Sequence, residues 1–149
     1  MILRKKCRKV IEIDKEIKQL IVNMAQTMEK NQGVGLSAPQ VGVLKNIIVV
    51  RGDFKGQRIL ALVNPKITKK SKEKEKDIEG CLSFPGISLE IKRAKEIEIK
   101  GLDINGEKIK LKTKGLLARI FQHEIDHLNG ILFSDRLGFF ERIKFKLWH

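Results

Sequence analysis

Gln122-His123-Glu124-Ile125-Asp126-His127-Leu128 is the stretch around which this chain of 149 residues is organised. Two of the three histidines, His123 and His127, stand here four residues apart, and Glu124 directly follows the first. Because an α-helix advances about 100° per residue, residues at this spacing project from nearly one face. The two imidazoles can therefore bind one metal ion with Glu124 beside it, which is the H-E-x-x-H pattern of a hydrolytic metal centre.

A catalytic centre of this kind needs a third protein ligand and one position left open for water. His149 is the last residue, and chain ends are seldom held rigidly enough to serve as ligands. The position six residues beyond His127 is Phe133, which excludes the longer metzincin pattern. Cys81, in the turn-rich stretch 79–86, is the natural third ligand and predicts a Cys-His-His set.

The same residues predict the chemistry. A metal ion bound by this set would acidify water, and Glu124 could take the proton and deliver it to a leaving nitrogen. Amide or peptide hydrolysis is the reaction that such a site performs. Its oxyanion needs hydrogen-bond donors, which the side chain of Gln40 and the backbone N–H of Leu82, next to the ligand Cys81, could supply.

Residues one turn and two turns before the first histidine describe the surroundings of the predicted metal. Leu116 and Ile120 continue the histidine-bearing face of the helix as apolar residues, which suits a pocket for an apolar side chain. Arg119 and Asp126 lie on the other flank of this face. We interpret them as polar or ionic support rather than as catalytic groups.

Composition restricts the class of protein. With 42% hydrophobic residues and no low-complexity tract, we expect one domain over residues 1–149. No apolar run approaches the roughly 18–20 residues that span a bilayer, and the first residues lack the apolar core of a signal peptide. A soluble, cytoplasmic protein with no membrane partner is expected. Two cysteines do not indicate a disulfide scaffold, and Cys7 is expected to be a small buried or half-buried residue.

The net charge of +13 raises a nucleic-acid interpretation. However, the basic residues are spread along the chain, aromatic residues make up only 5%, and tyrosine is absent, so platforms for stacking bases are scarce. A solvated, lysine-rich surface is favoured, and no specific nucleic-acid partner is expected. Weak, salt-sensitive attraction to RNA or to the ribosome stays open.

Hydrophobic spacing predicts the elements of the first third of the chain. Asp14 is a plausible N-cap of a long amphipathic helix that ends near Asn31, with an apolar stripe made of Ile13, Ile17, Leu20, Ile21, Met24 and Met28. Residues 33–42 contain three glycines and a proline, which predicts a loop with unusual backbone angles. The match of 33–38 to a dinucleotide-binding G-x-G-x-x-A fails, because a helix rather than a strand precedes it.

The remaining chain alternates apolar and polar residues as half-buried strands do. Strands are predicted at 47–50 and 60–63 as a hairpin ended by Asn64-Pro65, then at 87–91, 96–100 and 108–112, with Asn105-Gly106 as a two-residue hairpin turn. The charge run 69–76 is expected to be an exposed loop or edge hairpin. Gly115 opens the motif helix, Asn129-Gly130 closes it, and 137–148 could form a last short helix. The expected fold class is α+β, with mostly antiparallel sheets packed around a central metal-binding helix and an N-terminal amphipathic helix.

Three stretches together resemble the signature motifs of peptide deformylases. They are Gly33-Val34-Gly35-Leu36-Ser37-Ala38-Pro39-Gln40, Glu79-Gly80-Cys81-Leu82-Ser83 and Gln122-His123-Glu124-Ile125-Asp126-His127, in matching order and approximate spacing. One H-E-x-x-H is a moderate signal, whereas three such motifs are highly specific. The resemblance implies an enzyme that removes the formyl group from the N-terminal formylmethionine of new polypeptides and releases formate.

The resemblance also assigns residues. It implies that Cys81, His123 and His127 bind the metal, that Glu124 is the acid and base, and that Gln40 and the Leu82 amide stabilise the oxyanion. The Gly35 backbone would hold the substrate, with Val34, Leu116 and Ile120 near its methionine side chain. The implied cofactor is one divalent ion, ferrous iron in the cell, with zinc, nickel or cobalt able to replace it in the purified protein.

Two departures from the family pattern and two rival functions accompany this resemblance. Ser37 stands where the commonest pattern has alanine, a small-for-small change expected to be harmless, and typical members carry a further N-terminal segment before the equivalent of Leu3-Arg4. One rival is another metal-dependent amidase or peptidase with the same ligands. The other is a basic RNA-binding or ribosome-binding protein with a structural metal, which would need a closed site of four ligands and leaves Glu124 without a role.

Overall fold

The computed structural model of the chain describes residues 1–53 and 58–148. Its helices are α1 (Lys15–Lys30), α2 (Gly115–Leu128) and α3 (Phe139–Trp148), with short 3-10 turns η1 (Ile2–Arg4), η2 (Ala38–Val41) and η3 (Phe133–Arg136). Its strands are β1 (Gly35–Ser37), β2 (Ile47–Asp53), β3 (Arg58–Lys70), β4 (Lys74–Cys81), β5 (Phe84–Ala94), β6 (Glu96–Leu102) and β7 (Lys108–Lys114). His149 and residues 54–57, between the predicted strands 47–50 and 60–63, lie outside the described residues.

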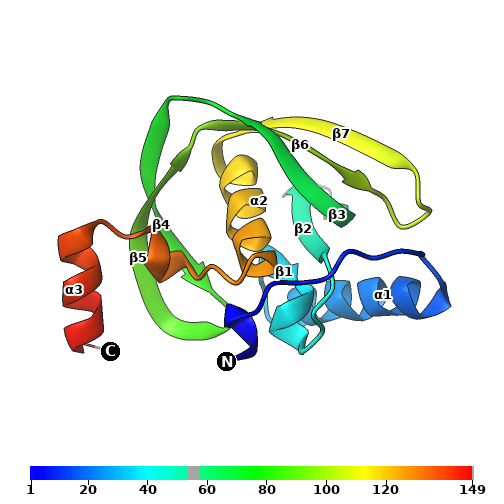
Figure 1. The fold of residues 1–149 in the computed structure, drawn as a ribbon, viewed down its shortest axis with the longest axis horizontal. Helices are drawn as coiled ribbons and strands as arrows, with labels where there is room; N and C mark the ends of the chain where they lie inside the picture. Colours follow the sequence, from blue (N-terminus) through cyan, green and yellow to red (C-terminus); the bar gives the residue numbers. More distant parts are fainter. Residues whose placement is uncertain (54–57, 149) are drawn as a thin grey trace.

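The strands form two sheets in which every pairing between named strands is antiparallel. One has five strands in the order β1-β2-β3-β6-β7, and the other is the hairpin of β4 and β5. In Figure 1 α2 stands in the middle of the molecule, between the β4–β5 hairpin and strands β1 and β2. The predicted α+β class, with antiparallel sheets around the motif helix, is confirmed.

Strand β2 is the centre of the core because both of its faces are covered. Its residues 47–50 are completely buried, and alternate side chains of a strand point to opposite faces. Ile47 and Val49 belong to the cluster that contains the apolar stripe of α1, made of Ile17, Ile21, Met24 and Met28. Ile48 and Val50 belong to the cluster that contains Ala118, Ile120, Phe121, Ile125 and Leu128 of α2. Helices α1 and α2 therefore pack on opposite faces of this strand.

Several sequence-based expectations hold in detail. Asp14 is the N-cap of α1, its carboxylate accepts a hydrogen bond from the Ile17 N–H at 2.9 Å, and Asn31 is the C-cap. The motif helix begins at Gly115 and has Asn129 as its C-cap. The last helix forms as α3, and Cys7 is buried.

The prediction that residues 33–42 form a loop with unusual backbone angles is wrong in its centre. Residues 35–37 form β1, which pairs with 48–50 of β2, and 38–41 form the turn η2. Within 33–42 the left-handed φ occurs only at Gly42, at 85°. Glycine at position 35 instead allows the Glu124 side chain to approach the backbone closely, because a Cβ there would lie 2.7 Å from the Glu124 Oε1. Backbone pairing with a buried strand overrides the low strand propensity of glycine.

Asn64-Pro65 does not end a strand, because β3 continues to Lys70. Asn64 adopts a left-handed φ of 52° at a shift in the β3–β6 register, and its side chain bonds the N–H and C=O of Val10 at 2.8 and 2.9 Å. These two hydrogen bonds hold the left-handed residue inside a continuing strand. The Asn-Pro pair alone, in contrast, predicts that the strand ends there. The charge run 69–76 is mostly exposed as expected, although it includes the end of β3 and the beginning of β4.

Two turns also differ from prediction. Strands β6 and β7 form the expected hairpin, but its loop spans 103–107 rather than Asn105-Gly106 alone, because the Asp103 carboxylate accepts hydrogen bonds from the N–H groups of Asn105 and Glu107. Residues 79–81 end strand β4, so the turn of the 79–86 stretch is confined to 82–83. Cys81 therefore lies on a strand end, which is held more firmly than a loop.

Two expectations concern the chain as a whole. Within the part that the structure describes, no helix has the length and apolar character needed to cross a membrane. The extent of a single domain over residues 1–149 stays a prediction.

We expect Asp14→Ala to lower the free energy of unfolding by about 1 kcal/mol, because the first turn of α1 loses its side-chain cap. The melting temperature should fall by about 2–4 °C in a chain of this size. Asp14→Asn is the matched control, since its amide oxygen can still accept the Ile17 N–H and should retain most of the stability. Thermal unfolding of the three proteins measures this, and equal losses in both variants would contradict a capping role.

Candidate metal centre

The three predicted ligands come together from two elements. Helix α2 carries His123 and His127, and the end of β4 carries Cys81, such that one potential ligand atom from each lies within 4.8 Å of the others. The Cys81 Sγ is 3.4 Å from the His127 Nε2, and the two imidazole rings stand edge to face with centroids 5.0 Å apart. The cysteine sulfur and two imidazole rings thus face a common point.

The donor set fits a single transition-metal ion. Thiolate and imidazole ligands suit zinc, iron, cobalt and nickel, whereas calcium and magnesium prefer oxygen ligands. Three protein ligands leave one position of a tetrahedral site open, as catalytic sites require. The His123 Nδ1 is already engaged by the Glu79 Oε1 at 2.9 Å, so the Nε2 is the nitrogen that stays available. An outer carboxylate that fixes the tautomer in this way is typical of metal-binding histidines.

The electrostatic surroundings treat the two histidines differently. Burial and the neighbouring His123 lower the pKa of His127 to about 3, so its ring is neutral. Burial alone would also lower the pKa of His123, but hydrogen bonds with Cys81 and Glu79 outweigh it and raise this pKa to about 10. Hydrogen-bond partners, rather than burial, thus distinguish the two rings.

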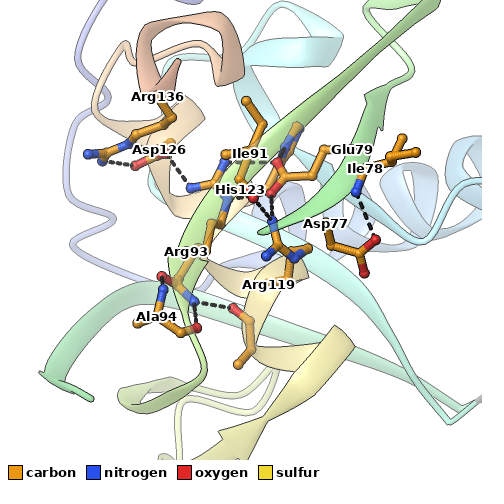
Figure 2. Close-up of polar contacts among 12 residues, drawn as sticks. Asp77, Ile78, Glu79, Ile91, Arg93, Ala94, Arg119, His123, Asp126 and Arg136 are labelled. Carbon is orange, nitrogen blue, oxygen red and sulfur yellow. Dashed lines mark hydrogen bonds and ion pairs between the residues drawn. The ribbon is translucent and has the colours of Figure 1, made fainter. Parts of the chain in front are cut away.

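Glu79 is the buried anion that holds this arrangement. Its carboxylate accepts hydrogen bonds from the Arg93 Nε at 2.6 Å and Nη2 at 2.9 Å, and from the Arg119 Nη1 at 2.6 Å, in addition to its contact with His123. Figure 2 shows the three cationic side chains converging on it. Burial disfavours the charged form, but the bonds from His123 and Arg93 outweigh this and lower the pKa of Glu79 to about 2.

The network continues along α2 to the C-terminal segment. The Arg93 Nη1 donates to the Asp126 Oδ2 at 2.8 Å, and Arg136 of η3 donates to the same carboxylate at 2.9 and 2.6 Å (Figure 2). Arg119 also donates to the Ile91 and Glu75 carbonyl oxygens, both at 2.8 Å. The expected supporting role of Arg119 and Asp126 thus has named partners on β4, β5 and η3.

Glu124 lies against the backbone of β1. It is 5% exposed, and its Oε2 has no hydrogen-bond partner among the described residues. Burial raises its pKa to about 7, despite the opposing charges of His123 and Arg93. A buried carboxyl group with one free oxygen and a pKa near neutrality can both accept and return a proton.

Gln40 of η2 reaches the same point from the other side. Its Nε2 is 3.5 Å from the Cys81 Sγ and donates to the Ser83 Oγ at 3.1 Å. Its Oε1 accepts from the N–H of Ser37 at 2.9 Å and from the Ser37 hydroxyl at 2.8 Å. The amide is therefore directed with its NH2 group toward the ligand cysteine.

A cleft of about 420 Å³ opens beside the ligands. Its lining includes eight of the predicted site residues, namely Val34, Gly35, Cys81, Leu82, Leu116, Ile120, His123 and Glu124. Three apolar side chains are only partly covered at its margins: Val34 is 43% exposed, Leu82 38% and Leu116 51%. Gln40 and His127 are not part of the lining. The side chain of each contacts the sulfur of Cys81, which does line the cleft.

Comparison with known proteins decides the family. The family model described as polypeptide deformylase matches residues 1–142. The chain belongs to the polypeptide deformylase family. As a member of this family it is a metal-dependent hydrolase that removes the N-formyl group of new polypeptides.

Individual deformylases resemble this chain over most of their length. Peptide deformylase 1 of Clostridium perfringens is 53% identical over 135 residues, which cover 90% of each protein. The solved deformylase of Thermus thermophilus matches with a TM-score of 0.92 and 39% identity over 99% of this chain and 86% of its own. That of Plasmodium falciparum matches with a TM-score of 0.90 and 40% identity over 98% and 87%.

Glu79, Arg93 and Ser83 were not predicted from the sequence as parts of the deformylase centre. Glu79 and Ser83 stand in the quoted cysteine motif, which was a signal, but nothing local assigns them a partner. Arg93 comes after the predicted strand 87–91 in a lysine-rich context that resembles an exposed edge, although it lies within β5 and is 4% exposed. Only the packing of β5 on α2 reveals its contact with Glu79.

We expect Glu79→Gln to weaken metal retention about 10–100-fold, because the amide cannot hold His123 as the carboxylate does. The free energy of unfolding should fall by about 3–5 kcal/mol, because Arg93 and Arg119 lose a buried counter-charge. Competition with a chelator measures the first and urea titration the second.

The matched control is Glu90→Gln. Glu90 is 59% exposed and pairs with Lys76 at 4.0 Å, so its loss should change the free energy of unfolding by less than about 0.5 kcal/mol. If the two variants behaved alike, the Glu79 network would not be what holds the centre.

Proposed function

We propose that Cys81, His123 and His127 bind the catalytic metal ion of this deformylase, and that Glu124, Gln40 and the Leu82 backbone perform the chemistry around it. The observation that carries the proposal is the cluster of three ligand atoms within 4.8 Å of one another at the wall of a cleft. When bound, a divalent ion supplies positive charge that acidifies water and polarises the formyl carbonyl group. The remaining steps belong to protein residues.

Glu124 moves the proton. Its carboxylate accepts the proton of the attacking water, and the resulting carboxylic acid delivers it to the nitrogen of the methionine amine as the bond between formyl carbon and nitrogen breaks. Burial raises the pKa of Glu124 above that of an ordinary carboxyl group, which favours the acid form that returns the proton. Products are formate and a free N-terminus.

Gln40 and Leu82 stabilise the negative charge that develops on the formyl oxygen. The Gln40 Nε2 is an N–H donor directed toward Cys81, and Leu82 follows that ligand directly in the chain. Donors that are fixed before the reaction lose little free energy to reorganisation, which is why such groups contribute strongly to rate.

The cleft binds the formylmethionine end of the substrate. The backbone of Gly35 runs along its wall, with Val34, Leu116 and Ile120 as apolar contacts for the methionine side chain. Gly35 is required here for a second reason, because any Cβ would also lie 3.0 Å from the Ile120 side chain. The Gly35 backbone that would hold the substrate therefore lies directly against the side chain of Glu124.

The metal and the surroundings of the enzyme are proposed in finer detail. We propose ferrous iron as the ion used in the cell, with zinc, nickel or cobalt taking its place in purified protein, since thiolate and imidazole accept all four. The substrates are formylmethionine ends of nascent polypeptides in the cytoplasm. The net charge of +13 supports weak electrostatic attraction to the ribosome, which lower salt would strengthen.

We expect Glu124→Gln to retain the metal and to lose turnover by about 10²–10⁴-fold, because the amide cannot accept the proton. Cys81→Ser should instead lose metal retention. Metal content and formate release, measured on each variant under anaerobic conditions, separate the two roles. Full activity of Glu124→Gln would overturn the mechanism.

We expect anaerobically purified enzyme to contain one iron per chain and to release formate from formyl-Met peptides while leaving acetyl-Met peptides nearly intact. We expect the additional methyl group of the acetyl substrate to fit poorly beside Glu124, which lies so close to the Gly35 backbone that a Cβ at Gly35 would be 2.7 Å from its carboxylate. The opposite preference would favour a different metal-dependent amidase. Iron-free but fully active enzyme would contradict only the choice of metal.

A further inference from the structure

Ser37 is a buried side chain that the mechanism above does not use. It ends strand β1, is completely inaccessible to solvent, and follows Leu36 in the cluster beneath α1. Its hydroxyl group donates to the Gln40 Oε1 at 2.8 Å, while its own backbone N–H donates to the same oxygen at 2.9 Å. One residue therefore occupies both acceptor positions of the Gln40 carbonyl oxygen.

This double contact determines which way the amide of Gln40 faces. An amide rotated by 180° would place the Nε2, a donor, against the N–H of Ser37, which is also a donor. With the Oε1 held by Ser37, the Nε2 faces the Cys81 Sγ and the Ser83 Oγ. Two donors on the oxygen also polarise the amide and strengthen the N–H on its other side.

We propose that the Ser37 hydroxyl is a positioning residue for deformylation: it holds the Gln40 amide with its N–H groups aimed at the reacting formyl oxygen. This inference rests on the oxyanion role proposed for Gln40. An alanine at position 37 keeps the backbone N–H contact but loses the hydroxyl, so the amide keeps its preferred face and loses half of its restraint. The substitution of serine for the commoner alanine, expected from sequence to be harmless, is then a functional difference.

Loss of the Ser37 hydroxyl should weaken stabilisation of the transition state, which is measured as a lower kcat. Ser37→Ala should lower kcat about 3–10-fold, which corresponds to about 0.6–1.4 kcal/mol, and leave KM unchanged because the substrate cleft is intact. Ser37→Cys, which fills the site with a slightly larger side chain but is a weak donor, should resemble Ser37→Ala. Ser71→Ala is the matched control, because the Ser71 hydroxyl also makes two hydrogen bonds but lies at the β3–β4 connection, and its kcat should equal that of the wild type.

A double-mutant cycle with Gln40→Ala distinguishes positioning from a general effect on the fold. If Ser37 acts through Gln40, adding Ser37→Ala to Gln40→Ala should change kcat by less than twofold. An equal loss in both backgrounds, or no loss in the wild-type background, would overturn the inference. A loss of kcat that follows a lower melting temperature in Ser37→Ala and is absent in Ser37→Cys would also overturn it.

The same cycle keeps the two proposals apart. If Gln40→Ala alone leaves kcat unchanged, the oxyanion role of Gln40 fails, and the inference about Ser37 fails with it. If Gln40→Ala lowers kcat and Ser37→Ala does not, only the inference about Ser37 fails.

Discussion

The carboxylate of Glu79 is the constraint on which the deformylase centre depends. It accepts two hydrogen bonds from Arg93 and one from Arg119, and it engages the Nδ1 of His123. Removing such an anion from water costs several kcal/mol, and the cost is recovered only when the partners satisfy its lone pairs in good geometry. Glu79 meets that condition, and the low pKa that results shows that the charged form is the stable one. Strand β4, which carries the cysteine ligand two residues later, is thereby attached to the helix that carries the histidines.

The same ion pairs connect the centre to the C-terminal part of the chain. Arg93 lies between Glu79 and Asp126 and donates to the Asp126 carboxylate. Arg136 of η3 donates to the other oxygen of the same carboxylate. Phe133 of that turn packs edge to face on the His123 ring, with centroids 5.7 Å apart. A disturbance of η3 thus reaches His123, a proposed metal ligand, through one charged and one aromatic contact. Helix α3 follows directly and has no buried side chain, and its Arg142 donates to the carbonyl oxygens of Asp135 in that turn and of Leu137 after it.

Sequence reasoning could predict what depends on spacing and could not predict what depends on packing. The positions of His123, Glu124 and His127 follow from helical periodicity, and the choice of Cys81 follows from the lack of another ligand. The α+β class follows from alternation along the strands. Glu79 and Arg93 could not be assigned, because charged residues are normally exposed and only their mutual contact allows burial. Strand β1 escaped prediction for a similar reason, since its glycine is placed there by the approach of Glu124.

The separation of the ligands along the chain has a consequence for the order of folding. Cys81 and His127 are 46 residues apart, and strands β5, β6 and β7 lie between them. Closing a loop of that length costs chain entropy before any contact repays it. An emerging polypeptide that has formed only α2 offers the ion two imidazoles, which make a weak site. If Cys81 and both histidines bind the ion, full affinity requires that β4 has docked, and metal capture is then a late event of folding.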